Sequence, residues 1–204
     1  MTLEGKKEED KMAKTIFSRK KSIYPEFSSF HIEKFWFDGR EYSTGEGAFQ
    51  SMKVLDESKR SEFTKLTGGQ AKKLGRQVPL RSDWESVKFE YMVEVVYSKF
   101  ASSERLKELL LSTGRSWICE DTTSWHDNVW GCCYCSRCSK KSSKNMLGFA
   151  LMFARAKLRG EEAIVSVIID GKEFDAPLKE LYNFIKTGDE RGLHLINVLN
   201  RNEC

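Results

Sequence analysis

Apolar residues recur every three or four positions in several stretches of the chain, which is the spacing of a helix with one buried face. We expect one helix after Ser43, which stands three residues before Glu46 in the spacing of a capping box. Residues 1–14 carry charge without an apolar period, so a disordered tail is predicted there. The other predicted helices are residues 83–100, 103–113, 145–160 and 177–188, with a last helical turn at 192–200.

Two places combine short apolar runs with a turn dipeptide, which predicts β-hairpins. Asp38-Gly39 separates two runs rich in aromatic residues, and Asp170-Gly171 ends an alternating run that starts at Val165. Together with the helices, these hairpins indicate an α+β fold, a mainly helical single domain with small antiparallel β elements.

The length and composition of the chain favour one domain. It has 204 residues, of which 40% are hydrophobic, enough for a substantial core. We place the domain at residues 15–160. Residues 161–204 are interpreted as a C-terminal extension made of the second hairpin and short helices.

Charge and hydropathy exclude several classes of protein. No apolar run approaches the roughly 18 residues of a membrane span, and the N-terminus lacks the apolar segment of an export signal. The protein is therefore expected to be cytoplasmic, without a membrane partner, and its oligomeric state stays open. The net charge of +4 permits an anionic ligand but does not indicate a dedicated duplex binder.

Four of the six cysteines lie close together in the sequence WGCCYCSRC. Cys132, Cys135 and Cys138 have the spacing C-x2-C-x2-C, and Cys119 or His126 would supply the fourth ligand that a tetrahedral zinc needs. The alternative is a set of reduced thiols on a loop that closes over a pocket, because the sequence has no second knuckle. We expect the thiols, so no cofactor is predicted, and zinc at Cys132, Cys135 and Cys138 is the alternative.

Four short motifs follow one another along the chain: FDGREYSTGEGAFQSMK, LGRQVPLRSDWESVK, DNVWG and KNMLGFALM. Their order and spacing resemble the NADAR family, also called YbiA-like, over about residues 15–160. The resemblance implies an α+β fold built largely of helices. It also implies a hydrolase with N-glycosidase activity, in which water cleaves the bond between a ribose carbon and a nitrogen. The implied substrates are phosphoribosyl-amine intermediates of riboflavin synthesis, or ADP-ribosylated guanine in nucleic acid.

Cleavage of an N-glycoside builds positive charge on the sugar, which a neighbouring carboxylate stabilises. Glu46 is the candidate for this carboxylate, because it matches the E-x-x-F-Q motif of the family. On a helix, Gln50 and Lys53 would share its face, and the three side chains together suit a sugar phosphate. Without the resemblance, Glu46 would be interpreted as the partner of Ser43 in a capping box, with Gln50 and Lys53 in solvent.

The D-x-x-W-G motif of the family places Asp127 before Trp130 and Gly131. Asp127 is the second catalytic candidate, as a carboxylate that holds the water or a ribose hydroxyl. Its alternative role is an Asx-turn that shapes the loop. Trp130 either stacks on the flat heterocycle of a substrate or belongs to the core. Gly131 is included with Trp130 among the candidate substrate-binding residues.

Arg76 and Arg81 are candidates for binding phosphate, because the planar guanidinium group matches the phosphate oxygens. The alternative for each is a surface ion pair. Asn145 stands at the start of a predicted helix, where it would act as the cap and direct backbone N–H groups at an anion. Ser29 departs from the family pattern, which has Asn at this position, and this would alter a substrate contact.

These residues leave three hypotheses. The first is an N-glycosidase whose ligand is a phosphorylated ribosyl small molecule or an ADP-ribosylated nucleic acid. The second is a non-catalytic module that binds ADP-ribose or a nucleotide. The third is a zinc-knuckle nucleic-acid protein, ranked last because the basic residues are scattered and the knuckle is incomplete. We favour the first, because a binding module needs no paired carboxylates such as Glu46 and Asp127.

Overall fold

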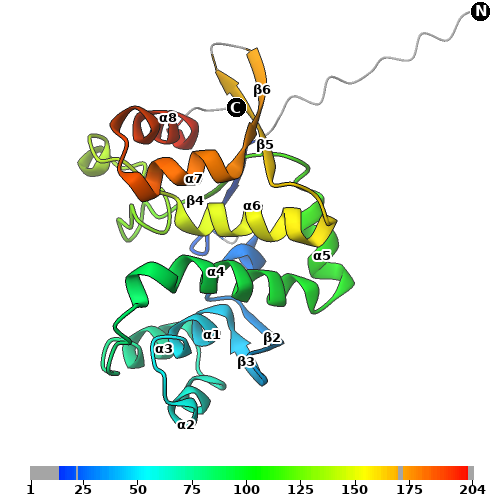
Figure 1. Cartoon of the computed structure of the whole chain (residues 1–204), viewed down its shortest axis with the longest axis vertical. Helices are drawn as coiled ribbons and strands as arrows, with labels where there is room; N and C mark the ends of the chain where they lie inside the picture. Colours follow the sequence, from blue (N-terminus) through cyan, green and yellow to red (C-terminus); the bar gives the residue numbers. More distant parts are fainter. Residues whose placement is uncertain (1–13, 22, 170–171, 202–204) are drawn as a thin grey trace, which may run out of the picture.

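Figure 1 shows the computed structural model of the chain, which describes residues 14–21, 23–169 and 172–201. Of the tail predicted at residues 1–14, only Lys14 lies inside the described residues. The α-helices are α1 Gly45–Ser51, α2 Glu57–Arg60, α3 Gly68–Leu74, α4 Trp84–Ala101, α5 Glu104–Leu111, α6 Met146–Arg159, α7 Leu178–Thr187 and α8 Glu190–Arg201. The 3-10 helices are η1 Pro25–Phe27, η2 Ser61–Phe63 and η3 Ser136–Cys138. Helix α8 is longer than the single turn predicted there.

The strands of the described residues form three two-stranded sheets. They are β1 Thr15–Phe17, β2 Ile32–Phe37, β3 Arg40–Thr44, β4 Ile118–Glu120, β5 Ile164–Ile169 and β6 Lys172–Pro177. The β2–β3 and β5–β6 pairs are antiparallel, as predicted. Strands β1 and β4 pair in parallel, with Thr15 beside Ile118. This third sheet joins segments far apart in the sequence, which no local pattern indicates. The predicted α+β class is confirmed.

The first hairpin has the turn that its dipeptide predicts. Asp38 and Gly39 both have positive φ, 50° and 70°, as the two central residues of a type I′ turn require. The turn predicted at Asp170-Gly171 lies outside the described residues. Strands β5 and β6 pair in register on either side of it, and Val165 is buried.

Helix α1 begins later than the capping-box spacing predicts. Ser43 remains in strand β3. Thr44 is the N-cap instead, and its side-chain oxygen accepts a hydrogen bond from the N–H of Gly47 at 3.0 Å. The capping-box interpretation of Glu46 is therefore wrong, because the serine it would pair with belongs to the strand.

Helices α4 and α6 pack against each other in the middle of the molecule (Figure 1). Residues 146–152 of α6 are all buried, so this helix forms the centre of the main core. The C-terminal extension belongs to the same core, since Val165, Leu178 and Ile196 are buried within it. The extension thus completes the domain rather than forming a separate body.

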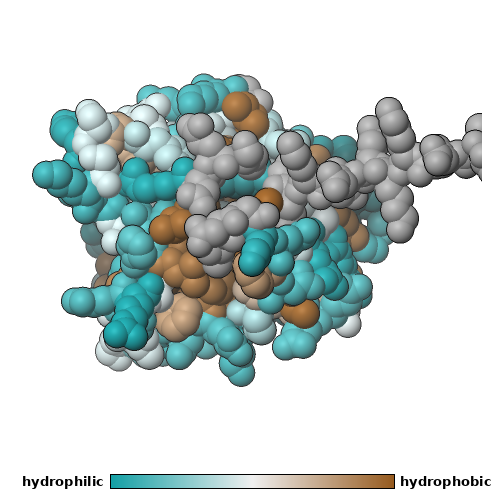
Figure 2. All heavy atoms as spheres, turned by 90° about the horizontal axis from the view of Figure 1, so that it is seen from above, coloured by the Kyte–Doolittle hydropathy of each residue, from teal (hydrophilic) through white to brown (hydrophobic). Residues whose placement is uncertain are grey.

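Figure 2 views the molecule from the end at which α8 and the β5–β6 hairpin lie. Hydrophilic residues predominate on this face, with hydrophobic residues gathered near its centre. Within the described residues, every helix is too short or too polar to cross a membrane.

Candidate active site

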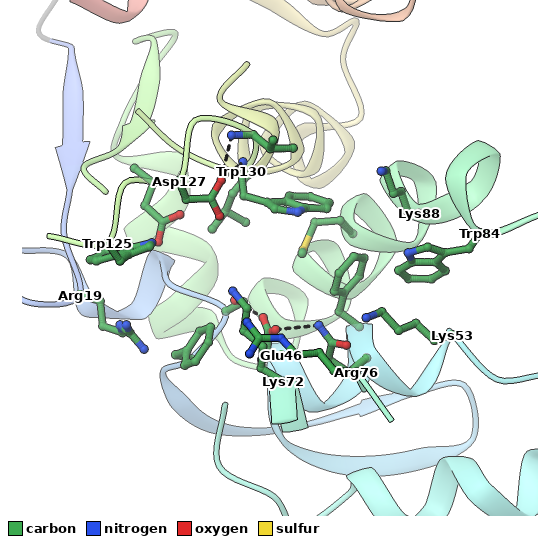
Figure 3. Close-up of a pocket in the computed structure, with 18 residues that line it drawn as sticks. Arg19, Glu46, Lys53, Lys72, Arg76, Trp84, Lys88, Trp125, Asp127 and Trp130 are labelled. Atoms are coloured by element: carbon green, nitrogen blue, oxygen red, sulfur yellow. Dashed lines mark hydrogen bonds between the residues drawn. The ribbon is translucent and has the colours of Figure 1, made fainter. Parts of the chain in front are cut away.

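A cavity of about 750 Å³ lies where α1, α3, α4 and the loop between β4 and α6 meet (Figure 3). Its lining combines acidic, basic and aromatic side chains from segments that are distant in the sequence. The acidic residues are Glu46, Glu120 and Asp127, and the basic residues are Arg19, Lys53, Lys72, Arg76 and Lys88. The predicted site residues that the cavity brings together are Glu46, Gln50, Lys53, Arg76, Asp127 and Trp130.

Both oxygens of the Glu46 carboxylate are held by hydrogen bonds. The Ser29 hydroxyl donates to Oε2 at 2.9 Å, and the Gln50 side-chain amide donates to Oε1 at 2.9 Å. The backbone N–H of Glu46 also donates to the carbonyl oxygen of Ser29 at 2.7 Å. The Glu46 side chain is buried, so these contacts fix the orientation of the carboxylate in the wall of the cavity. Ser29, the departure from the family pattern, thus acts on the carboxylate itself.

Lys53 reaches the cavity in a way that a continuous helix would not provide. Helix α1 ends at Ser51, so Lys53 lies beyond it, and the expectation of one helical face is wrong for this residue. Its ammonium donates to the carbonyl oxygen of Gly75 at 2.9 Å and lies 5.8 Å from the centre of the Trp84 ring. Burial lowers the pKa of Lys53, and the nearby Arg76 adds to this effect.

Asp127 forms the Asx-turn that the sequence offers as its alternative role. Its Oδ1 atom accepts hydrogen bonds from the N–H groups of Val129 at 2.8 Å and Trp130 at 2.9 Å, which is the Asx-turn arrangement. Both bonds use the same oxygen, so among the described residues Oδ2 has no donor. Because Asp127 also lines the cavity, this second oxygen is available to a water or a sugar hydroxyl.

Glu120 is a functional candidate that the sequence did not reveal. It ends strand β4, is 8% exposed and lines the cavity together with Asp127. Burial raises the pKa of Glu120 to about 8, and the negative charges of Asp127 and Glu46 contribute in the same direction. No motif distinguishes this glutamate from the other acidic residues, since its position depends on the pairing of β4 with β1.

Aromatic rings form the remaining walls. Trp130 is half-buried, and its ring meets that of Phe49 edge to face with centroids 5.1 Å apart. It therefore packs on the core and also faces the cavity. At the opposite side, the guanidinium group of Arg19 lies 4.3 Å from the centre of the Phe30 ring and 5.1 Å from that of Trp125 (Figure 3). Trp84 also lines the cavity.

Arg81 lies outside the lining of the cavity. Its guanidinium group forms a bidentate pair with Asp83, with Nε to Oδ1 at 2.6 Å and Nη2 to Oδ2 at 2.9 Å. A further bond from Nη1 reaches the Tyr91 hydroxyl at 2.9 Å. The ion-pair alternative therefore describes Arg81, because its donors are already occupied within the protein. Arg76 is the arginine of this motif that faces the cavity.

Asn145 stands at the N-terminus of α6, but it does not prepare an anion site. The first N–H groups of the helix donate to the carbonyl oxygens of Val129 at 3.1 Å and Trp130 at 2.9 Å. The Asn145 side chain is fully buried and donates to the carbonyl oxygen of Ile118 at 2.8 Å. The helix end therefore holds the loop that carries Trp130, and the predicted contact with an anion is not present in this geometry.

Gly131 also lies outside the lining of the cavity. Close packing explains why this position is a glycine. A Cβ atom at this position would stand 2.3 Å from Cγ2 of Thr122 and 2.9 Å from the carbonyl oxygen of Glu120. Only glycine allows the loop to approach strand β4 this closely.

The cysteines that the structure describes divide into two groups. Cys132 is buried with Cys119, their sulfur atoms 3.8 Å apart. The adjacent Cys133 points elsewhere, toward His126, and joins Cys135 and Cys138. The alternative metal set predicted from sequence, Cys132, Cys135 and Cys138, is therefore wrong for Cys132, because Cys133 is the residue that lies with the other two. Cys132 forms a β-bridge with Asp121, just beyond strand β4, and its side chain joins the main core, whereas that of the adjacent Cys133 does not.

The chain resembles known proteins in both sequence and structure. The family model of the NADAR domain matches residues 16–159. The chain is 34% identical to the N-glycosidase YbiA of Escherichia coli (strain K12) over 142 residues, which is 68% of this chain and 84% of that protein. An N-glycosidase of Nostoc punctiforme is 32% identical over 140 residues, 65% of this chain and 85% of its own length. The NMR structure of the E. coli protein YbiA superposes with a TM-score of 0.61 at 32% identity, covering 78% of this chain and 94% of that one.

Proposed function

The chain belongs to the NADAR family, and we propose that it is an N-glycosidase that hydrolyses the bond between the anomeric carbon of a phosphorylated ribose and a nitrogen. The observation that carries the proposal is the Glu46 carboxylate. It is fixed by two donors in a cavity that also contains Glu120, Asp127 and a set of basic side chains. The relatives named N-glycosidase support the reaction class.

In this proposal Glu46 stabilises the positive charge that develops on the ribose ring as the bond to nitrogen breaks. Its two hydrogen bonds keep the carboxylate in place, so little reorganisation is needed at the moment of reaction.

Asp127 and Glu120 divide the proton transfers. The free oxygen of Asp127 orients the attacking water and accepts its proton. Glu120 holds a proton at neutral pH because its pKa is raised to about 8, and it donates that proton to the departing nitrogen. Water adds to the ribose carbon, the C–N bond electrons stay with the nitrogen, and the products are a free ribose hydroxyl and an N–H group.

The basic side chains account for the phosphate of the substrate. Arg76, Lys53 and Lys72 line the wall next to Glu46 (Figure 3), where they suit a phosphate attached to the same ribose. The ring of Trp130 suits the flat heterocycle on the other side of the bond. This chemistry is shared by riboflavin intermediates and by ADP-ribosylated guanine, so the two substrate classes must be separated by experiment.

The test is a mass-spectrometric hydrolysis assay with wild type and Glu46→Gln. Each protein is incubated with ADP-ribosylated guanosine, with the same adduct in single-stranded DNA, and with early riboflavin intermediates. We expect wild type to cleave one class and Glu46→Gln to lose at least about a hundredfold in rate, as when a preorganised electrostatic group is removed. Glu85→Gln, which changes an exposed acid on α4, is the control and retains activity.

The outcomes separate the hypotheses. Release of unmodified guanosine or unmodified DNA together with ADP-ribose assigns the protein to the reversal of ADP-ribosylation, and cleavage of the riboflavin intermediates alone makes it a metabolic hydrolase. Binding of one ligand without any cleavage would contradict the enzyme and favour the non-catalytic ADP-ribose or nucleotide module. Full activity of Glu46→Gln would remove Glu46 from the mechanism.

A further inference from the structure

Four potential metal ligands converge beside the loop that enters the cavity. The side chains are His126, Cys133, Cys135 and Cys138, and one ligand atom from each lies within 4.8 Å of all the others. The Sγ atoms of Cys133 and Cys135 are 3.3 Å apart, and Nδ1 of His126 is 3.4 Å from both. The Sγ atom of Cys138 is 4.0 Å from the same nitrogen.

These separations match those of a tetrahedral zinc site. With Zn–S bonds of about 2.3 Å and Zn–N bonds of about 2.0 Å, neighbouring ligand atoms stand roughly 3.5 to 3.8 Å apart. Three thiolates and one imidazole form a soft ligand set that favours zinc over hard cations. We propose that His126, Cys133, Cys135 and Cys138 bind one zinc ion, and that this ion fixes the segment carrying Asp127 and Trp130.

The ligand set resolves why the cysteine spacing looked incomplete. The fourth ligand is not a second knuckle but His126, which precedes the cysteines and has a left-handed backbone with φ of 59°. Cys132 is excluded because its side chain faces Cys119 in the core. A site assigned from the C-x2-C-x2-C spacing alone would therefore contain the wrong cysteine.

All four coordination positions are filled by protein, which is typical of a structural zinc rather than a catalytic one. The ion has no position for a water, so hydrolysis stays with the carboxylates of the cavity. The metal instead joins the two ends of residues 126–133, because His126 begins this segment and Cys133 ends it. Asp127 and Trp130, which line the cavity, lie between the two ligands.

The C-terminal extension holds the same loop from another side. The guanidinium group of Arg201 in α8 donates to the carbonyl oxygens of Cys138 at 3.0 Å and Lys141 at 3.3 Å. Arg201 thus attaches residues 138–141 of the loop to α8. Zinc would attach the part of the loop around Cys133 and Cys135 to His126. Together, the Arg201 contacts and the zinc would restrain residues 126–141, which include Asp127.

One contact must change when the metal binds. Arg137 donates to Nε2 of His126. Zinc bound at Nδ1 requires the ring proton on Nε2, so both groups would then be donors. Arg137 is exposed, and we expect it to turn into solvent.

The experiment measures zinc in protein purified under reducing conditions, by plasma mass spectrometry, in three variants. We expect one zinc per chain in wild type and in Cys132→Ala. In Cys133→Ala and in Cys135→Ser, whose side chain is half-exposed in wild type, the affinity for zinc should fall. The loss should be at least the roughly tenfold to hundredfold seen when groups next to a metal ligand are changed. Cys132 and Cys133 are adjacent and both buried, so this pair separates loss of a ligand from loss of core packing. Cobalt substitution should give a thiolate charge-transfer band in wild type and Cys132→Ala alone.

The absence of zinc after incubation with zinc salt, or equal loss from Cys132→Ala and Cys133→Ala, would overturn the site. The positioning role is tested by amide hydrogen exchange of residues 126–133. This exchange should accelerate in Cys135→Ser, and unchanged exchange would overturn the role. Neither measurement uses turnover, so each stands whether or not the glycosidase proposal holds.

Discussion

Glu46, Asp127 and Glu120 face one cavity, but different groups surround each carboxyl. Glu46 receives donors on both oxygens, and Asp127 receives them on one. Glu120 is buried near the other two acids and keeps its proton to about pH 8. Carboxyl groups that differ in this way suit the separate tasks of charge stabilisation, water activation and proton donation.

The raised pKa of Glu120 predicts a pH dependence of stability. Between about pH 4.5 and 8, the folded protein holds a proton that the unfolded chain has released. Stability should therefore fall as pH rises through this window, by on the order of 1 kcal/mol per pH unit, and level off above it. Urea unfolding of wild type and Glu120→Gln at several pH values measures this. The groups that face Glu120 are Asp127 and Glu46, which raise its pKa, and Arg19 and Lys72, which lower it.

Glu120→Gln should lose this part of the pH dependence, because the amide does not titrate. If Glu120 is also the proton donor, turnover in wild type should decline above about pH 8 and Glu120→Gln should be slow at every pH. Parallel stability curves for the two proteins would contradict the raised pKa. An active variant with an unchanged alkaline decline would assign the proton to another group.

Local sequence patterns predicted the turns and helices that local interactions determine. The Asp38-Gly39 turn and helices α4 to α7 follow from turn chemistry and apolar spacing. Two of the errors occur where distant segments decide the outcome. Pairing of the loop with β4 determines which of Cys132 and Cys133 faces the core, and carbonyl groups of the loop occupy the α6 terminus where an anion was expected.

Close packing between the loop and strand β4 gives a prediction for Gly131. In Gly131→Ala the new methyl group would meet the carbonyl oxygen of Glu120 at 2.9 Å, and backbone cannot yield as a flexible side chain does. The loop should shift, with a loss of about 1–3 kcal/mol in the free energy of unfolding and reduced turnover. Gly69→Ala in α3 is the control, because a Cβ atom there meets nothing within 4 Å. Equal stability of the two variants in urea unfolding would show that the loop accommodates the methyl group.

The C-terminal extension continues past residues 16–159, which the NADAR model matches, yet it contributes to the same core. Its helix α8 also reaches the segments that build the cavity. Asn200 of α8 contacts strand β4, which carries Glu120, and also the loop between β4 and α6. The Oδ1 atom of Asn200 accepts hydrogen bonds from the Trp117 indole N–H at 3.0 Å and the Cys119 thiol at 3.4 Å.

Asn200 therefore ties three parts of the fold together. Its side-chain amide also donates to the carbonyl oxygen of Ser143 at 2.7 Å, and the residue is fully buried. Asn200→Ala would leave the Trp117 indole and the Ser143 carbonyl without these partners, at about 1–3 kcal/mol for each buried group. We expect a clear loss of stability in urea unfolding and faster hydrogen exchange in residues 139–145. The exposed Asn183→Ala in α7 should stay within about 0.5 kcal/mol of wild type. If Asn200→Ala is as stable as that control, the extension does not hold the loop between β4 and α6. The position of the loop would then depend on α6 and on the proposed zinc ligands.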